Sequence, residues 1–209
     1  MNPTPFQRAL IFAALLVTLA ATRVHHFAFV PDASWAVFFI GGFYLRRQVA
    51  WVFPSLLLLA GVVDWAVISA AGLDFWNHYC VSPGYWMLVP AYLAMWLGGA
   101  WLRRGYVGAG WPALGRLLLA VAVSTAVCHL FSQAGFYWLS DSWAGSTTAG
   151  ASLAGWWKNY TDWLLPHPSV GSHGYLLTVM GYVAIGAVLQ VAAEQAVRLR
   201  PRRAGHGPT

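Results

Sequence analysis

The sequence predicts an all-α integral membrane protein of about six transmembrane helices in a single domain. Of its residues 59% are hydrophobic and 9% are charged, whereas about a quarter of the residues in a soluble domain are charged. Apolar stretches close to the ~20 residues that cross a bilayer recur along nearly the whole chain. The first stretch is not followed by a cleavage site and a soluble chain, so we expect a retained helix.

The predicted spans are apolar runs bounded by polar residues, and they cover residues 6–21, 27–45, 49–71, 85–101, 113–139 and 174–197. The first span ends near Arg23. Pro31 and Asp32 oppose a continuous helix through the start of the second span, which ends before Arg46. The third span tolerates Pro54 because this residue lies in its first turns.

Turn residues and basic residues bound the spans of the second half of the chain. Pro83 and Gly84 precede the fourth span, and Arg103 follows it. The fifth and sixth spans are separated by residues 140–173, which we expect to form a long external loop rich in Gly, Ser, Thr and Trp. A basic tail at 198–209 ends the chain.

The Lys and Arg residues predict the orientation of these spans. In a six-helix topology ten of them fall on one side, namely Arg8, Arg46, Arg47, Arg103, Arg104, Arg116, Arg198, Arg200, Arg202 and Arg203. Arg23 and Lys158 fall on the other side. Because basic loops stay in the cytoplasm, we expect both termini there and the functional groups on the external face.

Several classes of function lack their signature sequences. The chain contains no HExxH, GxSxG or GxxxxGK[ST] pattern, so we expect no nucleotide site and no ATP hydrolysis. The net charge of +6 resides beside apolar spans, which favours a role in membrane orientation over a nucleic-acid partner. The two cysteines form neither a CxxC pair nor a disulfide framework.

The densest group of reactive side chains lies in residues 74–85, the predicted external loop between the third and fourth spans. Cys80 is a candidate metal ligand because thiolates bind transition metals. His78 would face the same way as Cys80 in an extended segment. The alternatives are an ordinary packed cysteine and an interfacial histidine.

Asp64 lies inside the third span, and an intramembrane carboxylate is a candidate functional residue. Its alternative role is a hydrogen bond to a neighbouring helix. Tryptophans in and beside the long loop either lie at the headgroup belt or together cover a site; they are Trp138, Trp143, Trp156, Trp157 and Trp163. Cys128 and His129 lie within the fifth span, where we expect packed or hydrogen-bonded roles.

The chain resembles the BtuM-type cobalamin transport proteins, relatives of the substrate-binding S components of energy-coupling-factor (ECF) transporters. The resemblance rests on the six-span layout, on Asp64, and on the segment His-Tyr-Cys-x-Ser-Pro-Gly-Tyr at residues 78–85. It implies an S-component-like bundle with an outward-facing pocket that takes up cobalamin (vitamin B12) across the bacterial inner membrane. Cys80 would then be the axial ligand of the cobalt in this bound substrate.

The ligand-binding residues expected from this resemblance and from position are Cys80, Tyr85, Asp64, His78 and Trp157. Axial ligands alter the electronics of the opposite position in macrocycles, so we hypothesise that Cys80 also assists removal of an upper cyanide. That decyanation would be the catalytic activity of an otherwise transporting protein. An ECF-type energising module would contact the first span at Ala9 and Ala13, a small-xxx-small pair that in an alanine-rich span often has no role.

Two other functions are compatible with the sequence. A membrane haem or redox protein would use His and Cys as axial ligands, although His129 is the histidine that falls clearly inside a span. An assembly factor without a small ligand would need neither Cys80 nor Asp64. The visible spectrum of the purified protein distinguishes a corrin, a haem and a colourless protein.

Overall fold

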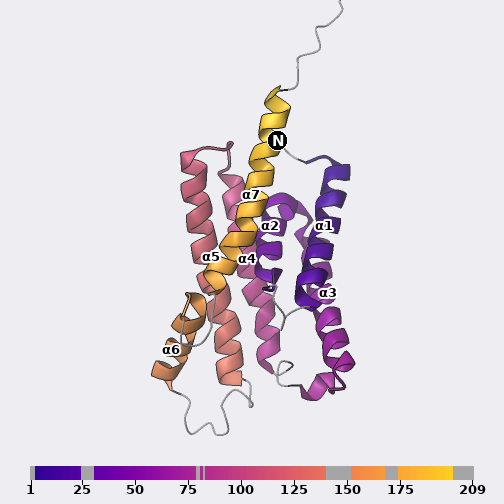
Figure 1. The fold of residues 1–209 in the computed structure, drawn as a ribbon, viewed down its shortest axis with the longest axis vertical. Helices are drawn as coiled ribbons and strands as arrows, with labels where there is room; N and C mark the ends of the chain where they lie inside the picture. The colour runs from indigo at the N-terminus through magenta and orange to yellow at the C-terminus, as the bar shows by residue number, and fades with distance from the viewer. Residues whose placement is uncertain are drawn as a thin grey trace, which may run out of the picture.

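The structure is a computed structural model that describes residues 3–24, 31–78, 81, 83–139, 152–167 and 174–199. Its α-helices are α1 (Pro5–Val24), α2 (Ser34–Leu45), α3 (Val49–Ala70), α4 (Leu88–Arg104), α5 (Trp111–Leu139), α6 (Leu153–Leu164) and α7 (Tyr175–Leu199) (Figure 1). Between them, the described residues include the short 3₁₀ helices η1 (Arg46–Gln48), η2 (Phe75–Asn77) and η4 (Pro83–Met87). No β-strand occurs among the described residues, which confirms the all-α prediction.

Four helical stretches of the described residues are long and apolar enough to cross a membrane, namely Pro5–Val24, Ser34–Ala70, Trp111–Leu139 and Tyr175–Val197. This confirms that the described residues include helices apolar enough for a membrane, by length and composition. The stretch Ser34–Ala70 combines α2, η1 and α3, and α4 has 17 residues. Both α2 and α4 are shorter than the ~20 residues that span a hydrocarbon core, so six crossings remain a prediction.

Helices α2 and α3 run in opposite directions, with η1 as the turn between them. The guanidinium of Arg23 contacts both Ser34, at the start of α2, and Asp64, near the end of α3. These two positions therefore lie at the same level of the bundle, as an antiparallel pair requires. Arg46 and Arg47 of this turn line one hollow with Arg8 of α1 and Arg103 of α4, so they lie at the end of the bundle where α1 begins. Helix α7 ends on the same side (Figure 1).

The helix bounds correct two of the predictions. Helix α2 begins at Ser34, and residues 31–33 are not helical, as the sequence signals of Pro31 and Asp32 indicated. The carboxylate of Asp32 accepts the backbone N–H of Ser34 at 2.9 Å just before the helix. The rest of the predicted start, residues 27–30, lies outside the described residues. The fourth helix begins at Leu88 instead of residue 85, since residues 83–87 form η4.

The predicted loop at 140–173 contains a helix, α6, which corrects that part of the prediction. Ser152 caps this helix by accepting the backbone N–H of Gly155 at 3.0 Å. A search for apolar spans misses this helix because it contains charged residues. Two of them, Lys158 and Asp162, form an ion pair within it. The flanking residues 140–151 and 168–173 lie outside the described residues.

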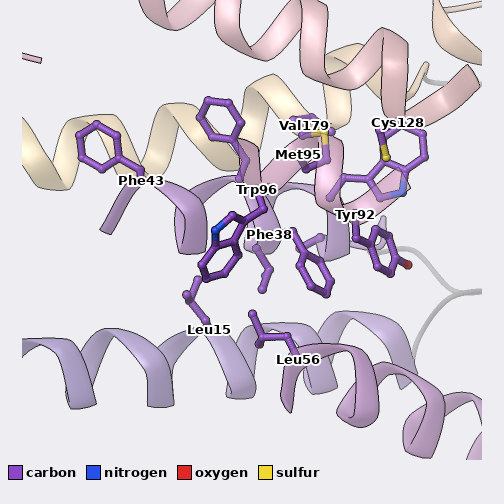
Figure 2. Packing of buried hydrophobic residues seen from close by; sticks show 14 of the residues in the cluster. Leu15, Phe38, Phe43, Leu56, Tyr92, Met95, Trp96, Cys128 and Val179 are labelled. Carbon is purple, nitrogen blue, oxygen red and sulfur yellow. The ribbon is translucent and has the colours of Figure 1, made fainter. Parts of the chain in front are cut away.

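The core is centred on the contact between α2 and α4, where glycines allow the backbones to approach. A Cβ atom built on Gly99 would lie 1.9 Å from the carbonyl oxygen of Phe39, and one on Gly42 would lie 2.0 Å from that of Trp96. Around this contact Phe38 stacks on Tyr92, with ring centroids 4.4 Å apart. Figure 2 shows these rings with the other buried side chains, among them Leu15, Leu56, Met95 and Cys128.

Candidate functional site

Arg23, near the end of α1, is the centre of a buried polar cluster. Its guanidinium donates two parallel hydrogen bonds to the carboxylate of Asp64, from Nε to Oδ1 at 2.6 Å and from Nη2 to Oδ2 at 2.7 Å. The side chain of Arg23 is 7% exposed and that of Asp64 is 18% exposed. This bidentate geometry is the strongest form of an Arg–carboxylate contact, and it joins α1 to α3.

The third nitrogen of Arg23 extends the cluster to α2 and α4. Its Nη1 donates to Asp32 Oδ2 at 3.1 Å, to Ser34 Oγ at 2.9 Å and to the hydroxyl of Tyr92 at 3.0 Å. One guanidinium therefore contacts side chains from three other segments of the bundle. An isolated buried cation is unfavourable. The hydrogen bonds and ion pairs with these partners offset the free-energy cost of burying the Arg23 guanidinium.

Tyr85 joins the same cluster from η4. Its hydroxyl donates a hydrogen bond to Asp64 Oδ2 at 2.7 Å. Burial is the largest cause and the negative charge of Asp64 the next. Both raise the pKa of Tyr85 above its ordinary value, so the phenol remains a neutral donor. Two of the residues expected from the sequence, Asp64 and Tyr85, are thus in direct contact, but Asp64 bonds to protein groups and positions Tyr85.

A close backbone contact fixes the position of η4. A Cβ atom on Gly84 would lie 2.4 Å from the carbonyl oxygen of Gly135 in α5, and one on Gly135 would lie 2.6 Å from the Cβ of Met87. Glycine is therefore required on both sides of this contact. The contact holds Tyr85 between α5 and the cluster around Arg23.

Cys80 lies outside the described residues, as do Tyr79 and Ser82. The described residues before and after it form turns between α3 and α4. The backbone N–H of His78 donates to Phe75 at 3.3 Å, and that of Val81 donates to the carbonyl of His78 at 2.8 Å. His78 is half-buried in this connection. His78 and Val81, the described residues on either side of Cys80, therefore lie in the connection between α3, which holds Asp64, and η4, which holds Tyr85.

Trp157 belongs to a different part of the molecule. It lies on α6, is 57% exposed, and stacks on Tyr160 with ring centroids 5.4 Å apart. Among the described contacts none joins Trp157 to Asp64 or Tyr85. Trp156 and Trp163 also lie on α6, Trp138 ends α5, and Trp143 lies outside the described residues. A tryptophan cover over the site stays a prediction.

His129 holds α6 against α5. Its Nε2 donates to the carbonyl oxygen of Tyr160 at 2.9 Å, while the hydroxyl of Tyr160 donates to the carbonyl of Ala126 at 3.0 Å. The side chain of His129 is buried beside the rings of Trp35 and Tyr175. The packed, hydrogen-bonded role expected from the sequence is confirmed for His129, and Cys128 beside it is fully buried.

Sequence reasoning missed Arg23, Asp32, Ser34 and Tyr92 as members of the cluster. A usable signal was present, since Arg23 is one of two basic residues predicted on the external side and Asp64 is a carboxylate within a span. Intramembrane charges pair with one another, so the two were the natural partners. The hydroxyl groups of Ser34 and Tyr92 give no comparable signal, because such residues are common in helices.

Within the described ranges no three His, Cys, Asp or Glu side chains gather into a metal-binding group. Ala9 and Ala13 are both exposed on α1, as a surface for a partner helix requires. The cavity that the described residues outline lies toward the other end of the bundle, between α2, α4, α5 and α7.

No protein-family model matches the chain, and no curated protein matches its sequence.

Proposed function

We propose that this chain is a substrate-binding membrane protein for cobalamin uptake, with Cys80 as the axial ligand of the corrin cobalt. One observation carries the proposal. Asp64 and Tyr85, the last residue of the segment 78–85, are among the sequence features that suggested this function, and they are joined by a 2.7 Å hydrogen bond. They are 21 residues apart in the chain, and sequence proximity does not explain their contact.

The cluster has the properties that a rigid support for such a site needs. Arg23 holds the carboxylate of Asp64 with two bonds, and Asp64 in turn accepts the hydroxyl of Tyr85. A ligand residue five positions before Tyr85 would be carried on a segment anchored at its far end to four helices. Preorganisation of this kind lowers the entropy lost when a large ligand binds.

The role that we propose for Asp64 is positioning, whereas direct contact with cobalamin falls to Cys80 and the ring of Tyr85. Cyanide loss from bound cyanocobalamin would be a ligand exchange: the thiolate would replace the lower axial ligand, cyanide ion would leave the upper position, and the oxidation state of cobalt would not change. Uptake would also need an energising partner of the ECF type, for which the exposed residues Ala9 and Ala13 are the proposed contact.

The visible spectrum of the purified protein with added cobalamin tests the proposal. The native chain should retain a corrin whose absorption band is shifted by cobalt–thiolate ligation, and Cys80→Ala should lose that shift. Cys128→Ala is the matched control, because it removes a buried thiol in α5 and leaves Cys80 in place. A corrin band that is the same in all three proteins would exclude Cys80 as the ligand.

Absence of a corrin from all three proteins would reject cobalamin as the substrate. A haem spectrum in the native protein would support the redox alternative instead. The described residues offer no observation that favours this alternative, since Nε2 of the buried His129 is engaged by the carbonyl of Tyr160.

A further inference from the structure

A cavity of about 600 Å³ opens among α2, α4, α5 and α7, toward the end of the bundle opposite the Arg23 cluster. Its walls are almost entirely apolar side chains, among them Ile40, Leu114, Leu117, Val183 and Val191. The volume falls within the ~300–1,000 Å³ typical of small-ligand sites. Because its lining is apolar, the cavity favours binding of a hydrocarbon over binding of a polar solute.

Hydrogen bonds between α7 and its neighbours define the polar end of the cavity. Glu194 accepts from the hydroxyl of Tyr106 at 2.7 Å and from the backbone N–H of Ala109 at 3.1 Å. Gln190 donates to Glu194 at 2.8 Å and accepts the hydroxyl of Tyr44 at 2.6 Å. Burial and the bond to Glu194 raise the pKa of Tyr106 to about 12, so this phenol stays a donor. The carboxylate of Glu194 is thus occupied by protein groups.

A cluster of arginines lies directly beside the cavity. A second hollow shares Phe43 and Tyr44 with the cavity and is lined by Arg8, Arg46, Arg47 and Arg103, which come from α1, η1 and α4. The guanidinium of Arg103 lies 5.1 Å from the ring centroid of Phe43, at the boundary between the two hollows. Four cations therefore adjoin an apolar cavity at one end of a membrane-type bundle.

We propose that the cavity and this arginine cluster together bind one anionic phospholipid. An acyl chain would occupy the apolar cavity, and the phosphate would lie among Arg46, Arg47 and Arg103. Basic pockets between transmembrane helices on the cytoplasmic side are sites for anionic headgroups, and the distribution of Arg predicts that this end is cytoplasmic.

Native mass spectrometry of the full chain tests this proposal with dioleoyl phosphatidylglycerol and with dioleoyl phosphatidylcholine. The protein should retain phosphatidylglycerol in preference to the neutral-headgroup lipid. Arg46→Gln and Arg47→Gln should each weaken phosphatidylglycerol binding about 5-fold, as expected for ~1 kcal/mol per basic residue. Arg104→Gln is the matched control, because this exposed arginine lies at the same end but lines neither hollow.

The acyl-chain part of the proposal has its own matched pair on α7. Gly186 lines the cavity, and a Cβ there would meet Ile40 at an ordinary 3.4 Å, so Gly186→Leu should fill the space and lower retention of both lipids. Gly181→Leu places the same side chain in open space and should leave retention unchanged. If Gly186→Leu does not purify as a monodisperse protein, Gly186→Ala provides a smaller filling with the same expected direction.

Three results would overturn the proposal. Equal retention of the two lipids by the native protein would remove the role of the arginines. Unchanged phosphatidylglycerol binding in a folded Gly186→Leu or Gly186→Ala protein would remove the acyl chain from the cavity. Complete displacement of phosphatidylglycerol by soluble glycerol 3-phosphate would indicate an anion site alone, without a seat for hydrocarbon.

Discussion

Arg23 and Asp64 are 41 residues apart in the chain and form a two-bond ion pair, with N–O distances of 2.6 and 2.7 Å. The pair joins α1 to α3, and through Asp32, Ser34 and Tyr92 it extends to α2 and α4. Ion pairs of this depth add little net stability relative to apolar side chains, but removal of one partner is costly. We expect the main effect of the Arg23–Asp64 pair to be that it fixes the position of Tyr85, whose hydroxyl donates to Asp64.

Replacement of Arg23 by methionine should destabilise the protein strongly. The substitution keeps a long apolar side chain but leaves the carboxylates of Asp32 and Asp64 without their guanidinium partner, at a cost of about 3–5 kcal/mol. Thermal unfolding in detergent, followed by loss of monodisperse protein, measures the effect. The double variant Arg23→Met with Asp64→Leu should recover part of the loss, and equal loss in both proteins would argue against an energetically coupled pair.

Tyr85→Phe separates the hydroxyl from the ring. Loss of the hydrogen bond to Asp64 should loosen η4 and weaken cobalamin binding about 5-fold, as expected for a net ~1 kcal/mol per hydrogen bond. A spectrophotometric titration of the purified protein measures the affinity. Tyr106→Phe is the matched control, since it removes a tyrosine hydroxyl bonded to a carboxylate at the other end of the bundle. Equal weakening in both variants would remove the specific role of Tyr85.

Gly99→Ala should destabilise the contact between α2 and α4. The added methyl group would lie 1.9 Å from the carbonyl oxygen of Phe39, so the two helices must separate. Overpacking of this type costs about 1–3 kcal/mol, and a lower melting temperature should follow. Gly115→Ala on α5 meets nothing within 4 Å and should leave the melting temperature unchanged or higher. A tolerated Gly99→Ala would mean that α2 and α4 do not pack this closely.

His129→Leu should loosen α6 without unfolding the bundle. The substitution removes the 2.9 Å bond to the carbonyl of Tyr160 but keeps an apolar side chain in the core. Hydrogen–deuterium exchange should then be faster in Leu153–Leu164 and unchanged in α2 and α4. Tyr160→Phe, which removes the bond to Ala126, should act in the same direction. Faster exchange throughout the chain would indicate a general loss of stability instead.

The all-α membrane fold and most helix bounds were predictable from the sequence. Predicted spans at 49–71, 113–139 and 174–197 compare with α3 at Val49–Ala70, α5 at Trp111–Leu139 and α7 at Tyr175–Leu199. Apolar runs of this length have few alternatives, because a bilayer accepts backbone only as hydrogen-bonded helix or closed barrel. Helix α6 was missed because its charged residues depart from that pattern.

The sequence by itself determined that the helices are apolar enough to cross a membrane, that arginine is concentrated on one side of the predicted topology, and that Asp64 and Tyr85 are candidate site residues. Tertiary structure alone decided that Asp64 bonds to Arg23, that Tyr85 reaches Asp64 from η4, and that an apolar cavity adjoins the arginines around Phe43. The physical reason is that the composition and hydropathy of a span depend only on residues that are consecutive in the sequence. Partners of a buried polar group depend on helix register and on close backbone contacts such as that of Gly84 with Gly135.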